Sequence, residues 1–203
     1  MNKIEKIKQF TKERFDELRW LHTQDVVSIA LILAEKEGAD KEIVEISAWL
    51  HDIGTTDKRA KIITHHIYSA EIVQGLLKEL DFEPKKIEQI IRCIKEHMGP
   101  INTFDILLRA EGKTQEFLPR PSTIESKVVY DADMINLCSP FGVVKTIILN
   151  TKEGKNFKEI INNIKTFTTQ AFNDLKTKSG KEIGKKYFFM SREFLEMVEL
   201  QAS

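Results

Sequence analysis

The feature that most constrains the fold is the period of the apolar residues, which recur every three or four positions along nearly the whole chain. This spacing places them on one side of a helix, whereas a strand alternates every second residue. No strand-like alternation of any length is present. The sequence therefore predicts an all-α fold, with helices at about residues 2–19, 22–37, 40–51, 65–80, 84–98, 121–135, 141–149, 155–177 and 180–200.

The size and charge of the chain favour one ordinary domain. Its 203 residues are 41% hydrophobic, and 31 basic residues balance 31 acidic ones. A neutral chain gives no electrostatic case for general binding to nucleic acid or a membrane surface, although a local basic patch stays open. Cys93 and Cys138 are not spaced as a metal pair or a disulfide framework, so they are expected to be buried thiols in a reducing compartment. No N-terminal apolar run suits a signal peptide or membrane span, and a cytoplasmic location is expected.

An adjacent histidine and aspartate, His51 and Asp52, end the apolar run that begins at Ala48, and Gly54 follows at once. Neighbours on a helix point about 100° apart and rarely share a packing role. At the end of a buried helix the two side chains can instead converge on one point, where a metal with nitrogen and oxygen ligands would fit. The alternative is a solvated histidine beside a capping aspartate, which is common at helix ends.

The other histidines favour the metal. His22, His65 and His97 fall on the apolar stripes of three further helices. Each buried imidazole needs its own polar partner, and a metal centre would satisfy all of them together. His66 lies one step off its stripe and is expected at the surface or behind the ligands.

Two carboxylates, Asp131 and Asp133, interrupt the otherwise apolar helix over 121–135. Such groups are costly in a core unless they are paired or bind a metal. The helical period places Asp131 closer to the stripe of Ile124, Val128 and Ile135, so periodicity alone leaves the choice between the two aspartates open.

The ordered series of His22, the His51-Asp52 doublet and a late aspartate resembles the HD-domain superfamily of metal-dependent phosphohydrolases. The late aspartate of that family typically follows an alanine, which implies Asp133. The resemblance implies a single HD-domain helical bundle over residues 1–203, with a motif-bearing core at about 20–137 and two long helices in an extension at about 139–203. The tail, with Leu175-Lys176-Thr177 and the run from Met190 to Leu195, is similar to that of uncharacterised bacterial and archaeal HD hydrolases.

His65 and His97 resemble the two extra histidines of HD members that bind two metals. The resemblance implies that they complete a second metal site, which Asp52 would bridge, or contact the substrate phosphate beside a single metal. The acidic pair that follows the doublet in alarmone hydrolases is replaced here by Thr55-Thr56. The Gly-Tyr-Pro signature of cyclic-di-GMP phosphodiesterases is also absent, so neither substrate is favoured.

The function expected from these residues is hydrolysis of a phosphate ester or anhydride, on a nucleotide or another small phosphorylated metabolite. A divalent Mn, Fe, Zn, Mg, Co or Ni ion would activate water, and Asp52 would bind the metal and hold that water. Lys58, Arg59 and Lys61 are candidates to bind the phosphate, and their alternative is a solvated run of charge.

Several questions stay open at the level of sequence. A non-catalytic HD module that binds a ligand or partner is the alternative function, although the retention of every motif position argues against it. Nucleic-acid binding is disfavoured by the zero net charge, and the oligomeric state is not predicted. Residues 99–121 are rich in glycine and proline, which predicts a long loop that is either a lid over the site or a surface excursion.

Overall fold

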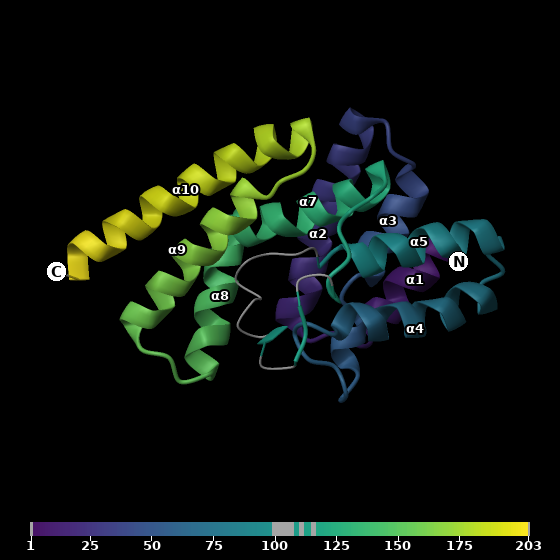
Figure 1. Cartoon of the computed structure of the whole chain (residues 1–203), viewed down its shortest axis with the longest axis horizontal. Coiled ribbons are helices and arrows are strands. Elements are labelled where there is room, and N and C mark those ends of the chain that lie inside the picture. Colours follow the sequence, from purple (N-terminus) through teal and green to yellow (C-terminus); the bar gives the residue numbers. More distant parts are fainter. Residues whose placement is uncertain (1, 99–107, 110–111, 115–116, 203) are drawn as a thin grey trace.

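The computed structural model describes residues 2–98, 108–109, 112–114 and 117–202, and every regular element in these ranges is helical (Figure 1). The predicted all-α fold is therefore confirmed. The elements are α1 (Lys3–Lys12), α2 (Glu17–Glu37), α3 (Lys41–Leu50), the short 3-10 helix η1 (Ile53–Thr56), α4 (His65–Glu79), α5 (Pro84–Glu96), α7 (Ile124–Cys138), α8 (Pro140–Lys152), α9 (Phe157–Asn173) and α10 (Lys178–Ala202). The predicted loop at 99–121 lies largely outside the described residues.

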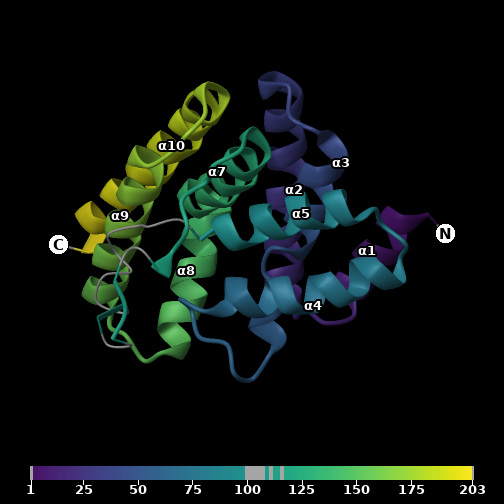
Figure 2. The same ribbon diagram turned by 45° about the vertical axis from the view of Figure 1, so that its right-hand side comes forward.

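Helix α7 is the central element of the molecule. It packs against α2, α3 and α5 on one side and against α8, α9 and α10 on the other. Figures 1 and 2 both show α9 and α10 side by side at the C-terminal end, with α1, α4 and α5 at the opposite end. Val128, Val129 and Tyr130 are fully buried in α7, so this helix joins the two halves through one apolar core.

The first predicted helix, over 2–19, is wrong in its extent. The chain leaves α1 after Lys12 and starts α2 at Glu17, because the Asp16 carboxylate accepts a hydrogen bond from the Arg19 backbone N–H at 2.8 Å and caps the new helix. Helix α2 ends at Gly38, whose φ of 69° is the left-handed conformation that glycine adopts at low cost. His22 therefore lies well inside α2.

The two tryptophans of the chain stack on each other between α2 and α3. The ring centroids of Trp20 and Trp49 lie 5.3 Å apart at an interplanar angle of 21°. The ammonium groups of Lys8 and Lys12 lie over Trp49 and Trp20, at 5.7 and 5.9 Å from the ring centroids. Offset stacking of this kind stabilises the contact beyond the apolar area it buries. The pair thus holds α2 against α3 two residues before His22 and His51.

Asp131 anchors the C-terminal tail to α7. Its carboxylate accepts hydrogen bonds at 2.7 Å from the backbone N–H groups of Lys176 and Thr177 and from the Thr177 hydroxyl. Burial raises the pKa of Asp131, and these hydrogen bonds oppose the shift. The neighbouring Tyr130 hydroxyl donates to Asp174. One of the two candidate carboxylates therefore has a structural role at the start of α10.

Among the described residues, no single helix is long and apolar enough to cross a membrane. Helices α7 and α8 meet that test only as a pair, and the pair is bent by 71°.

Candidate metal centre

The fold brings six predicted ligands together from five segments. His22 lies within α2, His51 caps the C-terminus of α3, and Asp52 directly precedes η1. His65 is the first residue of α4, His97 follows the last residue of α5, and Asp133 lies in α7. The four histidines are at most 7% exposed, as the apolar stripes predicted.

The position of three histidines next to helix ends determines which ring nitrogen faces the site. The Nδ1 atoms of His51 and His65 lie 2.8 and 2.7 Å from the carbonyl oxygens of Ala48 and Ile62, three residues before each histidine. His97 makes the same contact with the carbonyl of Ile94. The last carbonyls of a helix lack an intrahelical partner, so those of α3 and α5 are free to accept a proton from Nδ1. Nε2 therefore faces the centre, where it can serve as a metal ligand.

His22 reaches the same state through a side chain. Its Nδ1 lies 2.7 Å from the Asn136 amide oxygen, and the Asn136 amide nitrogen donates to Asp25 at 2.7 Å. The Asp25 carboxylate thereby orients the amide with its oxygen toward the ring. All four Nδ1 atoms are thus occupied, and all four Nε2 atoms remain for the centre.

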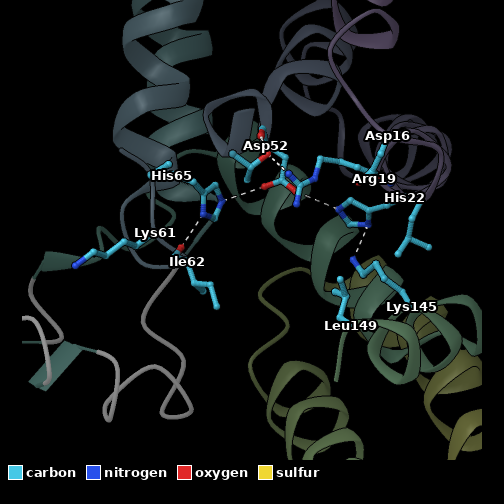
Figure 3. Close-up of a pocket in the computed structure, with 12 residues that line it drawn as sticks. Asp16, Arg19, His22, Asp52, Lys61, Ile62, His65, Lys145 and Leu149 are labelled. Carbon is cyan, nitrogen blue, oxygen red and sulfur yellow. Dashed lines mark hydrogen bonds and ion pairs between the residues drawn. The ribbon is translucent and has the colours of Figure 1, made fainter. Parts of the chain in front are cut away.

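The Asp52 carboxylate lies between two pairs of histidines. Its Oδ2 is 3.7 Å from the Nε2 atoms of His22 and His51. Its Oδ1 is 3.0 Å from His65 Nε2 and 3.7 Å from His97 Nε2. Each pair, together with Asp52, offers three ligand atoms within 4.8 Å of one another, and Figure 3 shows His22 and His65 on opposite sides of Asp52. The arrangement thus has two half-sites that share the Asp52 carboxylate. The first contains His22 and His51, and the second contains His65 and His97.

Asp133, and not Asp131, faces the histidines. Asp133 Oδ1 lies 3.4 Å from His22 Nε2, on the side of the first half-site. The two aspartates are two residues apart and therefore leave α7 in different directions. The preference for an aspartate that follows Ala132 agrees with this placement, whereas the helical period favoured the residue that holds the tail.

The charge states suit a cation. Burial, helped by the nearby Lys145 ammonium, lowers the pKa of His22 from 6.5 to about 3, so its imidazole is neutral at physiological pH. Burial alone would raise the pKa of Asp52, but His51 and His65 outweigh it and keep the pKa well below its usual range. Burial is likewise outweighed at Asp133 by His22 and His51, and its pKa is lowered. Neutral imidazoles and ionised carboxylates are the forms that bind metals.

Gly54 lets η1, which follows Asp52, lie directly against α4, which begins at His65. Its backbone N–H donates to the Ser69 hydroxyl at 2.8 Å, and that hydroxyl donates to the His51 carbonyl at 2.7 Å. A Cβ on Gly54 would lie 2.2 Å from the His65 carbonyl oxygen and 2.3 Å from the Ser69 nitrogen. Only glycine allows η1 to approach α4 this closely.

A cavity of about 370 Å³ opens beside the cluster (Figure 3). Its lining includes His22, Asp52 and His65, the cations Arg19, Lys61 and Lys145, and the apolar Leu18, Ile62 and Leu149. An adjoining cavity of about 170 Å³ shares several of these residues and reaches Asp133.

Only one of the three predicted phosphate contacts reaches this cavity. Lys61 lines it, although its side chain extends away from the histidines in Figure 3. Lys58 is exposed outside the lining. Arg59 lies outside the lining as well, where it makes an ion pair with Asp57 at 2.7 Å and packs on the Tyr68 ring. Sequence position after the doublet was therefore a poor guide to the basic wall of the cavity.

The surface location considered for His66 is wrong. Its side chain is 3% exposed, and its ring packs edge-on against Phe117 at a centroid distance of 5.7 Å. Burial lowers the pKa of His66 to about 3. Within the described part of the chain its Nδ1 has no hydrogen-bond partner.

Four further polar residues of the site were not predicted: Arg19, Asp25, Asn136 and Lys145. Three of them carried a signal in the sequence. Arg19 and Asp25 lie three residues before and after His22, and Asn136 lies three residues after Asp133, on the same helix face in each case. Lys145 carried no such signal, because its position depends on the angle between α7 and α8.

Comparison with known proteins agrees with this geometry. The family model of the HD domain matches residues 19–136, which contain all six clustered residues. The tRNA (cytidine(56)-2'-O)-methyltransferase of Picrophilus torridus is 30% identical over 154 residues, which are 75% of this chain and 41% of that protein. A second such methyltransferase, from Thermoplasma volcanium, is 28% identical over 116 residues. The chain thus spans less than half the length of these curated relatives.

Solved structures share the fold at low sequence identity. Bacillus subtilis YpgQ superposes with a TM-score of 0.74 at 18% identity, over 98% of this chain and 95% of that one. The same protein in complex with ADP gives a TM-score of 0.72 at 18% identity, over 98% and 97%. An HD-superfamily hydrolase from Bacillus thuringiensis gives 0.71 at 21% identity, over 99% and 98%. Because the family model matches more than half of the residues, and the matched part holds the histidine and aspartate cluster, the chain belongs to the HD domain family of hydrolases.

Proposed function

We propose that the protein is a metal-dependent phosphohydrolase that acts on a nucleotide or another small phosphorylated metabolite. The observation that carries the proposal is the position of Asp52, whose two oxygens face two separate pairs of histidine Nε2 atoms at 3.0–3.7 Å. The donor set of imidazole nitrogen and carboxylate oxygen suits Mn, Fe, Zn, Co or Ni, and Mg less well. His22, His51 and Asp133 would hold one metal, His65 and His97 a second, and Asp52 would bridge them.

The metal would supply a Lewis acid that polarises a phosphoryl oxygen and makes water nucleophilic at neutral pH. The residues of the chain contribute orientation. The hydrogen bonds at the four Nδ1 atoms fix the imidazole rings, and the partly exposed Asp52 carboxylate would bind the metal and hold the attacking water by a hydrogen bond.

The substrate class is supported by the size and the walls of the cavity. About 370 Å³ is within the range of small-molecule pockets, and its basic residues favour an anion. YpgQ, which shares the fold, has been solved with ADP, which supports a nucleotide. Methyl transfer is not proposed, because the chain covers only 41% of the similar methyltransferase and its clustered residues offer ligand atoms for a metal.

The test is metal analysis of protein purified without chelator, followed by a screen of phosphorylated metabolites with Mn, Mg, Co and Ni. We expect a bound divalent metal and release of phosphate or a phosphorylated product that stops in Asp52→Asn. Bound metal without turnover of any phosphate would instead favour a non-catalytic HD module that binds a ligand. Absence of metal binding would refute the phosphohydrolase.

A further inference from the structure

Two cations in the cavity lack a carboxylate partner. Among the described residues, no carboxylate oxygen lies within 4.0 Å of the charged group of Arg19 or Lys145. Arg19 donates to the Thr55 hydroxyl, and Lys145 lines both the 370 Å³ and the 170 Å³ cavities. Burial lowers the pKa of Lys145, and the Asp133 and Asp52 carboxylates oppose that shift from beyond 4.0 Å. Neither cation therefore has a direct ion pair among the described residues, and a partly buried cation without one favours a bound anion.

The position of Lys145 follows from how α8 begins. Ser139 caps that helix and Pro140 occupies its first turn, so the chain turns sharply after α7. A Cβ on Gly142 would lie 2.2 Å from the Asn136 carbonyl oxygen and 2.5 Å from that of Leu137. Glycine thus allows α8 to pack directly against the end of α7, and Lys145, about one turn later, comes to lie beside His22 (Figure 3). This segment lies beyond the part of the chain that the family model matches.

The nearest acceptors of Lys145 are already engaged with each other. Lys145 Nζ lies 2.9 Å from His22 Nδ1 and 3.4 Å from Asn136 Oδ1, and those two atoms are themselves 2.7 Å apart. While His22 donates its Nδ1 proton to Asn136, it cannot accept one from Lys145. An ammonium group has three N–H donors. At least two of them therefore lack an acceptor among the described residues and are available to a ligand.

We propose that Lys145 and Arg19 form an anion subsite that holds a phosphate group of the substrate beside Asp52. This inference rests on the proposed phosphohydrolase function. The two cations come from α8 and α2, and both line the 370 Å³ cavity together with His22. A phosphate bound between them would lie next to the first half-site. A guanidinium binds two phosphate oxygens side by side, and an ammonium adds a point charge. Leu18 and Leu149 supply apolar contacts for the remainder of the substrate.

The test is calorimetric titration of the manganese-loaded protein with inorganic phosphate. Lys145→Met is compared with Lys145→Arg and with Lys152→Met, which removes the same charge from an exposed position of the same helix. Lys145→Met is expected to weaken phosphate binding about tenfold or more, the loss of one charge-assisted hydrogen bond, at unchanged metal content. Lys145→Arg should recover part of the affinity, and Lys152→Met should match the parent protein. Arg19→Gln, from the other helix, is expected to weaken binding similarly.

Equal phosphate affinity in Lys145→Met and the parent protein, at equal metal content, would overturn the subsite. So would a parent protein that binds no phosphate at millimolar concentration. If Lys145→Met does not fold, Arg19→Gln and Lys145→Arg still decide the question. Because binding of inorganic phosphate is measured without turnover, the subsite can fail while hydrolysis is found, and it can be present where hydrolysis is not. In an active protein, Lys145→Met is further expected to raise KM for the substrate.

Discussion

Replacing Gly54 by alanine tests whether the contact between η1 and α4 holds the metal centre together. The added methyl carbon would lie 2.2 Å from the His65 carbonyl and 2.3 Å from the Ser69 nitrogen, so the two segments must separate. Overpacking of this kind costs about 1–3 kcal/mol. The separation also lengthens the hydrogen bonds from Gly54 to Ser69 and from Ser69 to His51, each of which contributes about 0.5–1.5 kcal/mol. We expect Gly54→Ala to lower the free energy of unfolding by about 2–6 kcal/mol.

Gly75→Ala is a matched control on α4. No atom lies within 4 Å of the position its Cβ would take, and the residue is exposed. Alanine in the interior of an exposed helix is more stable than glycine by about 0.5–1 kcal/mol, so the same chemical change should raise stability here. Urea unfolding of the metal-free proteins measures both effects. Metal analysis should show that Gly54→Ala alone lowers the metal content, because Asp52 and His65 lie on either side of the contact.

The reasoning would be refuted if Gly54→Ala were as stable as the parent protein. It would also be refuted if the variant were destabilised but bound metal with the parent stoichiometry and affinity. In that case η1 would have a packing role that is separate from the metal centre.

Three other predictions follow from the described contacts. The pKa values of His22 and His66 are about 3 in the folded chain, against an ordinary value of 6.5, so the unfolded chain binds more protons as the pH falls through 6.5. The metal-free protein should therefore be less stable at pH 5 than at pH 7, by about 2 kcal/mol per histidine. A free energy of unfolding in urea that does not change between these pH values would contradict this. Asp131→Ala should leave three hydrogen-bond donors unpaired and lower the thermal midpoint, while the metal content is retained. Asp133→Asn should weaken metal binding at nearly constant stability. Calorimetry and metal analysis measure both effects, and the reverse pattern would exchange the roles of the two aspartates. His97→Ala should reduce the metal bound per chain without emptying the half-site around His22, and unchanged stoichiometry would exclude His97 as a ligand.

The predictions from sequence were accurate where the geometry is local. The four clustered histidines lie on apolar helix faces, and the helical period is a short-range property that needs no knowledge of the rest of the fold. The same period overlooked the break between α1 and α2, because apolar Phe15 and Leu18 continue the stripe across the cap at Asp16. A local capping signal was present there, but the apolar pattern outweighed it.

The parts of the site that could not be predicted depend on how elements meet. Helix α7 is buried on opposite sides, so its period cannot tell the side that holds Asp131 against the tail from the side that presents Asp133 to the histidines. Lys145 reaches His22 only because α8 turns by 71° from α7 and packs on its end. Lys58 and Arg59 are close to the doublet in sequence but lie outside the cavity, because the cavity is lined by residues from several separate elements.

The stacked tryptophans provide an intrinsic fluorescence probe beside the candidate metal centre. Trp20 and Trp49 are the only indoles in the chain, and each lies two residues before a clustered histidine. Tryptophan emission therefore originates entirely at the junction of the two helices that carry His22 and His51. Any loosening of that junction alters the mutual orientation and solvent contact of both indoles together. We therefore expect tryptophan fluorescence to report metal binding, protonation of the buried histidines and unfolding of this half of the site in a single sample.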